Sequence, residues 1–245
     1  MTMTSPKVDS PMNTTAPLLQ IRDLHKNYGK TTALDGVNLD LTAGRIVGLL
    51  GENGCGKSTL LKTIAGVVAD YRGNVRVLGN TPGPETKAVT AFLPDSEFLP
   101  RGLTVRYCLE IYQDFFADFD RGRAHDMISF FGMDESMKLS EMSKGMREKV
   151  QIALTMSRRA KLYLLDEPIS GIDPAAREGI LEGILRNLEP DSLLIMSTHL
   201  IHDLEPALDT VVFMRQGQVT LTGDADDLRA EHGLSIDELF RKVYR

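Results

Sequence analysis

The sequence predicts an α/β fold in which a mainly parallel sheet carries a binding site at the carboxyl ends of its strands. Short, continuously apolar runs alternate with amphipathic segments, as in buried strands joined by helices. One such run leads directly into a glycine-rich loop followed by a segment without helix breakers. Two later runs end in acidic residues or in a histidine, where an open parallel sheet binds its ligands.

Composition and the first residues limit the class of protein. The chain has 245 residues, of which 42% are hydrophobic and 25% charged, as is ordinary for a soluble globular protein. Residues 1–16 are rich in Thr, Ser, Pro and Met, so we predict a disordered tail ahead of one domain at 17–245. The tail lacks the apolar segment of a secretory signal, and no apolar run approaches the roughly 18 residues that span a membrane. A net charge of −6 gives no reason to expect a nucleic-acid partner.

The first two strands are predicted at residues 18–24 and 37–41, where apolar and polar side chains alternate. Residues 26–30 between them form a turn signal that contains Tyr28. Two interpretations of Tyr28 carry equal weight at this point. Its ring either fills a hydrophobic space under the turn or faces a purine.

A phosphate-binding loop follows the apolar strand at 45–50. The loop matches G-x-x-x-x-G-K-[ST] and consists of Gly51, Glu52, Asn53, Gly54, Cys55, Gly56, Lys57, Ser58 and Thr59. The glycines let successive N–H groups converge on an anion, and a helix that begins near Lys57 adds the positive end of its dipole. Lys57 supplies a charge for the β- and γ-phosphates, and Ser58 supplies a hydroxyl for Mg²⁺.

The middle of the chain changes character after two short strands at 74–79 and 91–94 and a loop at 95–102. Apolar and aromatic residues recur at helical spacing from Val105 to Phe119. This pattern is typical of a small helical core, and part of the surface is also suited to a partner because aromatic residues are enriched at interfaces. Ser143 is a suitable N-cap for the amphipathic helix that follows it.

The second half adds polar groups to the edge where the loop lies. An apolar strand at 161–165 ends in Asp166 and Glu167, and another at 192–197 ends near His199. Asp166 is placed to organise Mg²⁺, and Glu167 to polarise an attacking water. Pro174 fits the first position of a helix running to about residue 188. Late strands are predicted at 211–214 and 218–221, and short helices at 226–231 and 236–243.

These motifs, in this order, resemble those of the ATP-binding subunit of an ABC transporter over about residues 18–222. The resemblance implies a P-loop NTPase of the ABC type, in which an antiparallel β subdomain and a helical subdomain at about 96–160 flank the core sheet. It assigns the loop at 51–59 to Walker A, Asp166 to Walker B, Glu167 to the catalytic glutamate and His199 to the switch histidine. It also settles Tyr28 as the aromatic that stacks on adenine.

The resemblance implies a mechanism that needs two subunits, either identical or different. Each ATP lies between the Walker A loop of one subunit and the signature of the other, which here begins Ser143-Lys144-Gly145-Met146. Ser143 and the N–H of Gly145 would contact the γ-phosphate held by the other subunit's Lys57. Binding of ATP with Mg²⁺ closes the pair, and hydrolysis, in which Lys57, Glu167 and His199 act, releases it.

Two departures from the family pattern bear on activity. Asp95 stands where the family usually has a glutamine that senses the γ-phosphate and Mg²⁺, so we expect an altered metal and phosphate sensor there. Lys144 and Met146 replace a glycine and a glutamine of the signature. We expect weakened or retuned ATPase activity rather than none, because Glu167 and His199 are present.

The signature and the short chain resemble exporter ATPases of the bacitracin-resistance kind, whose membrane permease is a separate polypeptide. This implies a peripheral position on the cytoplasmic face of the membrane. In the family, the loop after the sensor strand receives a coupling helix from the permease, and Phe98 and Leu99 are the candidates for its apolar contacts here. A soluble ABC-type ATPase of the cluster-assembly kind remains the alternative. A GTPase is disfavoured because no Asn-Lys-x-Asp occurs.

The two cysteines, Cys55 and Cys108, cannot form a disulfide framework and indicate a reducing compartment. Cys55 lies among converging N–H groups beside Lys57, a setting that lowers a thiol pKa. We therefore expect a reactive thiol that bound ATP protects.

Overall fold

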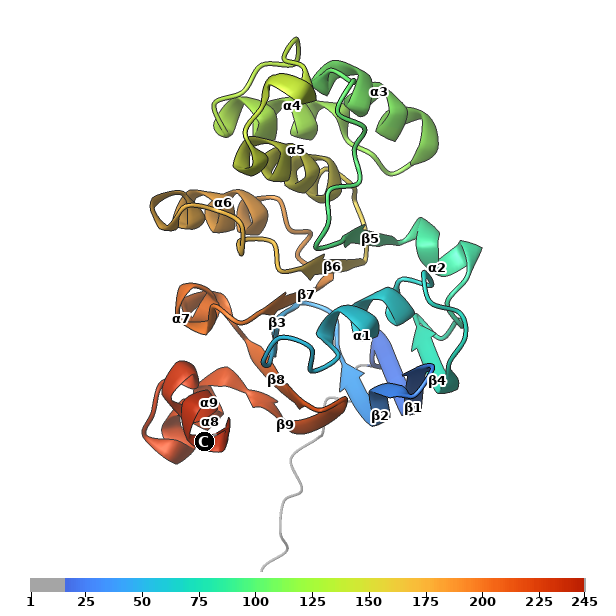
Figure 1. The fold of residues 1–245 in the computed structure, drawn as a ribbon, viewed down its shortest axis with the longest axis vertical. Helices are drawn as coiled ribbons and strands as arrows, with labels where there is room; N and C mark the ends of the chain where they lie inside the picture. Colours follow the sequence, from blue (N-terminus) through green and yellow to red (C-terminus); the bar gives the residue numbers. More distant parts are fainter. Residues whose placement is uncertain (1–15, 245) are drawn as a thin grey trace, which may run out of the picture.

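The computed structural model describes residues 16–244, and Figure 1 shows its fold. The predicted tail at 1–16 lies almost wholly outside the described residues. A six-stranded sheet forms the centre in the order β5-β6-β7-β3-β8-β9. Its strands are β3 (Arg45–Leu50), β5 (Thr90–Leu93), β6 (Leu162–Asp166), β7 (Leu193–Thr198), β8 (Thr210–Arg215) and β9 (Gln218–Asp224). All neighbours pair in parallel except β8 and β9, so the predicted mainly parallel core sheet is confirmed.

The apolar runs are continuous because both faces of this sheet are covered. Along β6, Leu162 and Leu164 point into one core, whereas Tyr163 and Leu165 point into the other. The side-chain period of two in a strand sends neighbours to opposite faces, so a strand buried on both sides needs apolar residues throughout. Strand β6 is accordingly buried at every position.

The first core lies on the face of the sheet toward which Leu162 and Leu164 point. It is covered by helix α1 (Lys57–Ile64) and by an antiparallel sheet in the order β2-β1-β4. Its strands are β1 (Leu19–Tyr28), β2 (Thr31–Leu41) and β4 (Arg72–Val77). The turn predicted at 26–30 is wrong in extent, since β1 continues to Tyr28 and only Gly29 and Lys30 separate the strands. Tyr28 pairs with Thr31 in the β1–β2 ladder, so the connection is a two-residue hairpin turn rather than a five-residue one.

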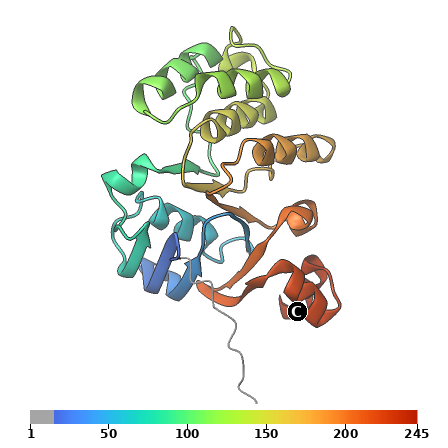
Figure 2. The ribbon, with the colours of Figure 1, turned by 180° about the vertical axis from the view of Figure 1, so that it is seen from behind.

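The second core, on the face toward which Tyr163 and Leu165 point, is covered by helices. They are α3 (Val105–Phe115), α4 (Arg121–Phe130), α5 (Lys144–Met156), α6 (Pro174–Arg186), α7 (Ile201–Leu204), α8 (Ala225–His232) and α9 (Ile236–Tyr244). Helices α3, α4 and α5 lie between β5 and β6 in the chain and form the upper end of the molecule (Figure 1). The rear view in Figure 2 shows α8 and α9 in red at the opposite end, beside β8 and β9.

Two local predictions need correction. The helical pattern through Phe119 is interrupted, because α3 ends at Phe115 and Phe119 reaches the ring of Tyr112 (centroids 5.6 Å apart) from the following turn. The short helices α2 (Pro84–Ala88) and α7 were missed, since five and four residues are too few for a periodic signal. Within residues 16–244, no helix is both long and apolar enough to cross a bilayer.

Candidate functional site

The phosphate loop occupies residues 51–56, between the end of β3 and the start of α1. It forms one wall of a pocket of about 310 Å³ that combines the loop with residues from three other parts of the chain. The lining residues are Thr31, Thr32, Ala33, Asn53, Gly54, Gly56, Lys57, Ser58, Thr59, Asp95 and Glu167. The structure therefore brings the glycine loop, the carboxylate after β6 and the residue after β5 to one place.

The three glycines of the loop are needed for different reasons. Gly56 has φ +113°, and a Cβ there would lie 2.5 Å from the carbonyl oxygen of Ala33. Gly54 has φ +80°, but a Cβ there would meet nothing within 4 Å. The sequence predicts that all three glycines take backbone angles that a side chain would forbid, but Gly51 does not have a positive φ. A Cβ at Gly51 would instead lie 2.5 Å from the carbonyl oxygen of Met214 in β8.

Lys57 is held beneath the loop that it follows. Its Nζ donates hydrogen bonds to the carbonyl oxygens of Gly51 at 2.7 Å and Glu52 at 3.2 Å. The same nitrogen lies 3.5 Å from Oε1 of Glu167, and the side chain is only 5% exposed. A buried ammonium with carbonyl and carboxylate oxygens around it presents a fixed positive charge to the pocket.

Asp166 and Glu167 each have one buried carboxylate oxygen without a hydrogen bond at the end of β6. Ser197 of the neighbouring strand β7 donates its hydroxyl to Oδ1 of Asp166 at 2.6 Å. Within residues 16–244, Oδ2 of Asp166 and Oε1 of Glu167 are buried and have no hydrogen-bond partner. Oε1 of Glu167 has the Lys57 ammonium as counter-charge, whereas Oδ2 of Asp166 has no such group in the described chain. A buried carboxylate oxygen is costly without a partner, so Oδ2 of Asp166 is suited to bind a cation.

The backbone at Glu167 holds the two carboxylates apart. Its φ is +51°, an uncommon value for a residue with a side chain. Its N–H donates to both the carbonyl oxygen and the hydroxyl of Ser197, at 3.1 and 3.0 Å. Strained backbone fixed by neighbouring hydrogen bonds is a common feature of functional sites. Here it lets Asp166 face β7 while Glu167 reaches His199 and Lys57.

His199 follows β7 and completes the group. Its Nδ1 lies 2.9 Å from Oε2 of Glu167, a hydrogen bond in which the ring nitrogen donates. The histidine side chain is 40% exposed, whereas that of Glu167 is 14% exposed. One carboxylate oxygen of Glu167 is therefore occupied by His199, and the other points toward the pocket.

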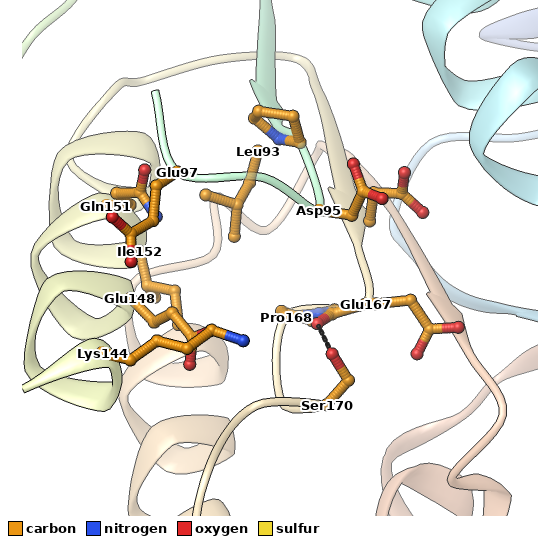
Figure 3. A pocket seen from close by; sticks show the side chains of 12 residues that line it. Leu93, Asp95, Glu97, Lys144, Glu148, Gln151, Ile152, Glu167, Pro168 and Ser170 are labelled. Atoms are coloured by element: carbon orange, nitrogen blue, oxygen red, sulfur yellow. Dashed lines mark hydrogen bonds and ion pairs between the residues drawn. The ribbon is translucent and has the colours of Figure 1, made fainter. Parts of the chain in front are cut away.

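Asp95 lines two pockets. It belongs to the phosphate-loop pocket and also to a smaller one between the sheet and α5 (Figure 3). Its Oδ1 lies 3.7 Å from Nζ of Lys62 in α1, and the side chain is 49% exposed. A carboxylate thus stands at the mouth of the phosphate site with a lysine as counter-charge.

Two signature residues, Ser143 and Gly145, lie outside both pockets, whereas Lys144 between them lines the small pocket with Asp95 and Glu167 (Figure 3). Ser143 is the N-cap of α5, and its Oγ accepts the N–H of Met146 at 3.2 Å. Within the described chain, neither Ser143 nor Gly145 lines the phosphate-loop pocket. The structure does not bring them to the site that contains Lys57.

Tyr28 is exposed, so the interpretation of a ring buried under the turn is wrong. The residue is 50% exposed, and Nζ of Lys26 lies 4.8 Å from the ring centroid. An exposed aromatic ring is suited to stacking with a flat ligand.

The expected low pKa of Cys55 is also wrong. The thiol is buried, with 7% of the residue exposed, and burial raises its pKa above the ordinary value. Lys57 and nearby backbone N–H groups act in the opposite direction but more weakly. The sequence shows the lysine beside Cys55, but not the depth at which the thiol lies.

Two residues of the site were missed in the sequence. Ser197 bonds both Asp166 and the backbone of Glu167, and Lys62 stands beside Asp95. A polar residue at the end of the strand before His199 was a usable signal for Ser197. The sequence contains no signal for Lys62, because its partner Asp95 is distant in the chain.

Comparison with known proteins gives concordant results. The family model described as ABC transporter matches residues 34–170. The ABC-type transporter ATP-binding protein EcsA of Bacillus subtilis (strain 168) is 28% identical over 92% of this chain and 96% of its own. The linearmycin resistance ATP-binding protein LnrL of the same strain is 30% identical over 88% of this chain and 72% of its own. A solved ATP-binding subunit of an ABC transporter superposes with a TM-score of 0.82 at 30% identity, covering 93% of this chain and all of that one.

Proposed function

Because the chain belongs to the ABC transporter family of ATPases, we propose that it is the ATP-binding subunit that powers a separate membrane permease by ATP-driven closure of two cassettes. The observation that carries this proposal is the separation of two half-sites. One half gathers Lys57, Glu167 and Asp95 around a pocket, and the other presents Ser143 at the start of α5. A second cassette is the partner that brings such halves together.

ATP is proposed to bind with its phosphates in the loop at 51–56 and its adenine on Tyr28. The backbone N–H groups of the loop and the amino-terminal end of α1 attract the phosphates. Lys57 neutralises charge on the β- and γ-phosphates. Residues Glu52, Asn53, Cys55 and Thr59 complete the loop, and Ser143 and Gly145 contribute from the second cassette.

Mg²⁺ is proposed to be held by Ser58, Asp166 and Asp95 together with phosphate oxygens. Within residues 16–244, no group of three or more His, Cys, Asp or Glu residues is placed to hold a metal by itself. That agrees with Mg²⁺, which commonly uses one or two carboxylates plus substrate phosphates. When bound, the ion would offset negative charge on the phosphates.

Hydrolysis is proposed to depend on Glu167, with His199 as its positioning partner at the γ-phosphate. A carboxylate with one oxygen fixed by His199 and the other directed to the pocket can accept a proton from a water aligned with the γ-phosphate. Lys57, 3.5 Å from that carboxylate, stabilises charge that develops on the phosphate.

The permease partner and the direction of transport are further parts of the proposal. The name of LnrL assigns it to linearmycin resistance, and removal of a toxic compound is one way in which a transporter confers resistance. Export from the cytoplasmic face of the membrane is therefore proposed for this chain, with an identical or a different second cassette. The finer resemblance to bacitracin-resistance ATPases stays a prediction.

Phe98 offers a test of the permease contact, because it is exposed whereas Leu99 is packed against the second core. The full chain carrying an affinity tag should be purified from detergent-solubilised membranes of its own host. We expect a polytopic membrane protein to co-purify, Phe98→Asp to abolish this, and Val67→Asp, at a site 61% exposed after α1, to leave it intact. Recovery only from the soluble fraction with a scaffold protein would favour the cluster-assembly alternative.

A further inference from the structure

The loop that carries Asp95 is tied to helix α5 by two side chains. We call residues 95–104, between β5 and α3, the sensor loop. Gln151 of α5 accepts the backbone N–H of Phe98 through its Oε1 at 2.9 Å. Arg147 donates from Nη2 to Oε1 of Glu97 at 2.8 Å. Figure 3 shows Glu97 and Gln151 side by side on one side of the small pocket, with Asp95 and Glu167 on the other.

Both ties are made by buried polar groups. Gln151 is 4% exposed and Arg147 is 8% exposed. Arg147 also donates from Nη1 to the carbonyl oxygen of Met142, just before the signature. The hydrogen bond from Arg147 to Glu97 is the main reason why the pKa of Glu97 lies below its ordinary value. Within the described residues, Nε of Arg147 is buried without a partner, so its two Nη contacts are the ones that hold this side chain. Loss of either contact would leave a further buried polar group unpaired.

The spacing on each side makes the connection stiff. Arg147 and Gln151 are one helical turn apart, so they lie on the same face of α5. Glu97 and Phe98 follow Asp95 by two and three residues, a span of at most about 11 Å of chain. Ser143, the N-cap of the same helix, lies one turn before Arg147. Helix α5 therefore links the signature to the residue at the mouth of the phosphate pocket.

We propose that Gln151 and Arg147 are positioning residues that fasten the sensor loop to α5 and thereby hold Asp95 at the mouth of the phosphate pocket. The inference rests on the proposed role of Asp95 at Mg²⁺.

The test uses the full chain with Gln151→Met, which keeps the volume but removes the acceptor. Gln151→Glu keeps an acceptor for the Phe98 N–H. Thr155→Val is the matched control, since Thr155 is equally buried on α5 but bonds only the carbonyl oxygen of Gln151 in its own helix. For each variant we measure kcat, KM for ATP, the Mg²⁺ concentration for half-maximal activity, and hydrogen exchange of the peptide spanning 95–104.

For Gln151→Met we expect kcat to fall about tenfold, the equivalent of about 1.4 kcal/mol. Because Asp95 is misplaced, half-saturation by Mg²⁺ should rise about three- to tenfold, a range of about 0.7–1.4 kcal/mol. KM for ATP should change by less than about twofold, since the loop at 51–56 keeps its own contacts. Exchange in the sensor loop should accelerate while that of β6 and β7 does not. Gln151→Glu should restore most of kcat, and Thr155→Val should leave the Mg²⁺ dependence unchanged.

Asp95→Ala, measured in parallel, separates failure of this inference from failure of the proposed metal site. If Asp95→Ala raises the Mg²⁺ requirement and Gln151→Met does not, the proposed site stands and the positioning role is refuted. If Asp95→Ala leaves the requirement unchanged, the metal role of Asp95 is refuted and the inference with it. If the Mg²⁺ requirement rose as much in Thr155→Val as in Gln151→Met, the effect would come from general destabilisation of α5, and the positioning role would be refuted.

Discussion

Nδ1 of His199 lies 2.9 Å from Oε2 of Glu167, and this pair joins the ends of the adjacent strands β6 and β7. The contact leaves Oε1 of Glu167 buried near Lys57, so one carboxylate is both oriented and available. Glu167→Gln keeps the size of the side chain but removes its basicity. We expect kcat for ATP hydrolysis to fall at least about 100-fold while ATP binding persists.

Purified wild type and Glu167→Gln should be compared by phosphate release and by equilibrium binding of a fluorescent ATP analogue. Glu178→Gln, at an exposed site on α6, is the matched control and should behave as wild type. If Glu167→Gln hydrolysed ATP at the wild-type rate, the assignment of the base would be wrong.

His199→Ala should reduce kcat without abolishing it. The carboxylate of Glu167 would lose a hydrogen bond to its charged form, typically worth about 1.5–3 kcal/mol, and would sample other rotamers. We expect kcat to fall about 10- to 100-fold. Steady-state kinetics of His199→Ala and His202→Ala, the latter exposed on α7, provide the comparison. Equal rates for the two variants would show that the contact with Glu167 does not matter for catalysis.

The loop glycines should differ in their tolerance of alanine. Gly56→Ala forces a side chain into a positive φ and against the Ala33 carbonyl, so it should cost roughly 1–3 kcal/mol and weaken ATP binding. Gly54→Ala incurs only the φ strain and should be milder. Gly179→Ala, inside α6 with open space around it, should stabilise the protein by about 0.5–1 kcal/mol. Urea unfolding and nucleotide titration measure the order, and a Gly54→Ala variant worse than Gly56→Ala would contradict it.

A structural feature could be predicted from the sequence when the residues that determine it are close together in the chain. Strands such as β3 and β6 were predictable because burial on both faces imposes an apolar run on the strand itself. The phosphate loop was predictable because its glycines and Lys57 are contiguous. The role of Ser197, the counter-charge of Lys62 and the ties from Gln151 and Arg147 depend on residues brought together from distant segments. Burial depth is likewise a property of the folded chain, which is why the pKa of Cys55 was misjudged.

Cys55 should react slowly with alkylating reagents in the folded protein. Its raised pKa lowers the fraction of thiolate at pH 7–8, and burial limits access. We expect alkylation by iodoacetamide to be at least about tenfold slower than that of a free cysteine, and to accelerate as pH rises or urea unfolds the chain. Peptide mass spectrometry separates Cys55 from Cys108, which is also buried and has a pKa raised to about 11. Rapid labelling of Cys55 at pH 7 that ATP suppresses would restore the original hypothesis.

Glu135 should make the stability of the helical end depend on pH. The hydrogen bond from Arg121 is the largest cause that lowers the Glu135 pKa from 4.5 to about 2, and His125 contributes a second one. A depressed carboxyl pKa stabilises the fold at pH values above the unfolded pKa, and this contribution is lost as pH falls from about 4.5 toward 2. Glu135→Gln should therefore cost roughly 1–3 kcal/mol at pH 7, and the difference from wild type should shrink below pH 4.5. Urea unfolding at pH 7, 4 and 3, with exposed Glu141→Gln as control, measures this, and a difference that stays constant with pH would refute the ion pair as its source.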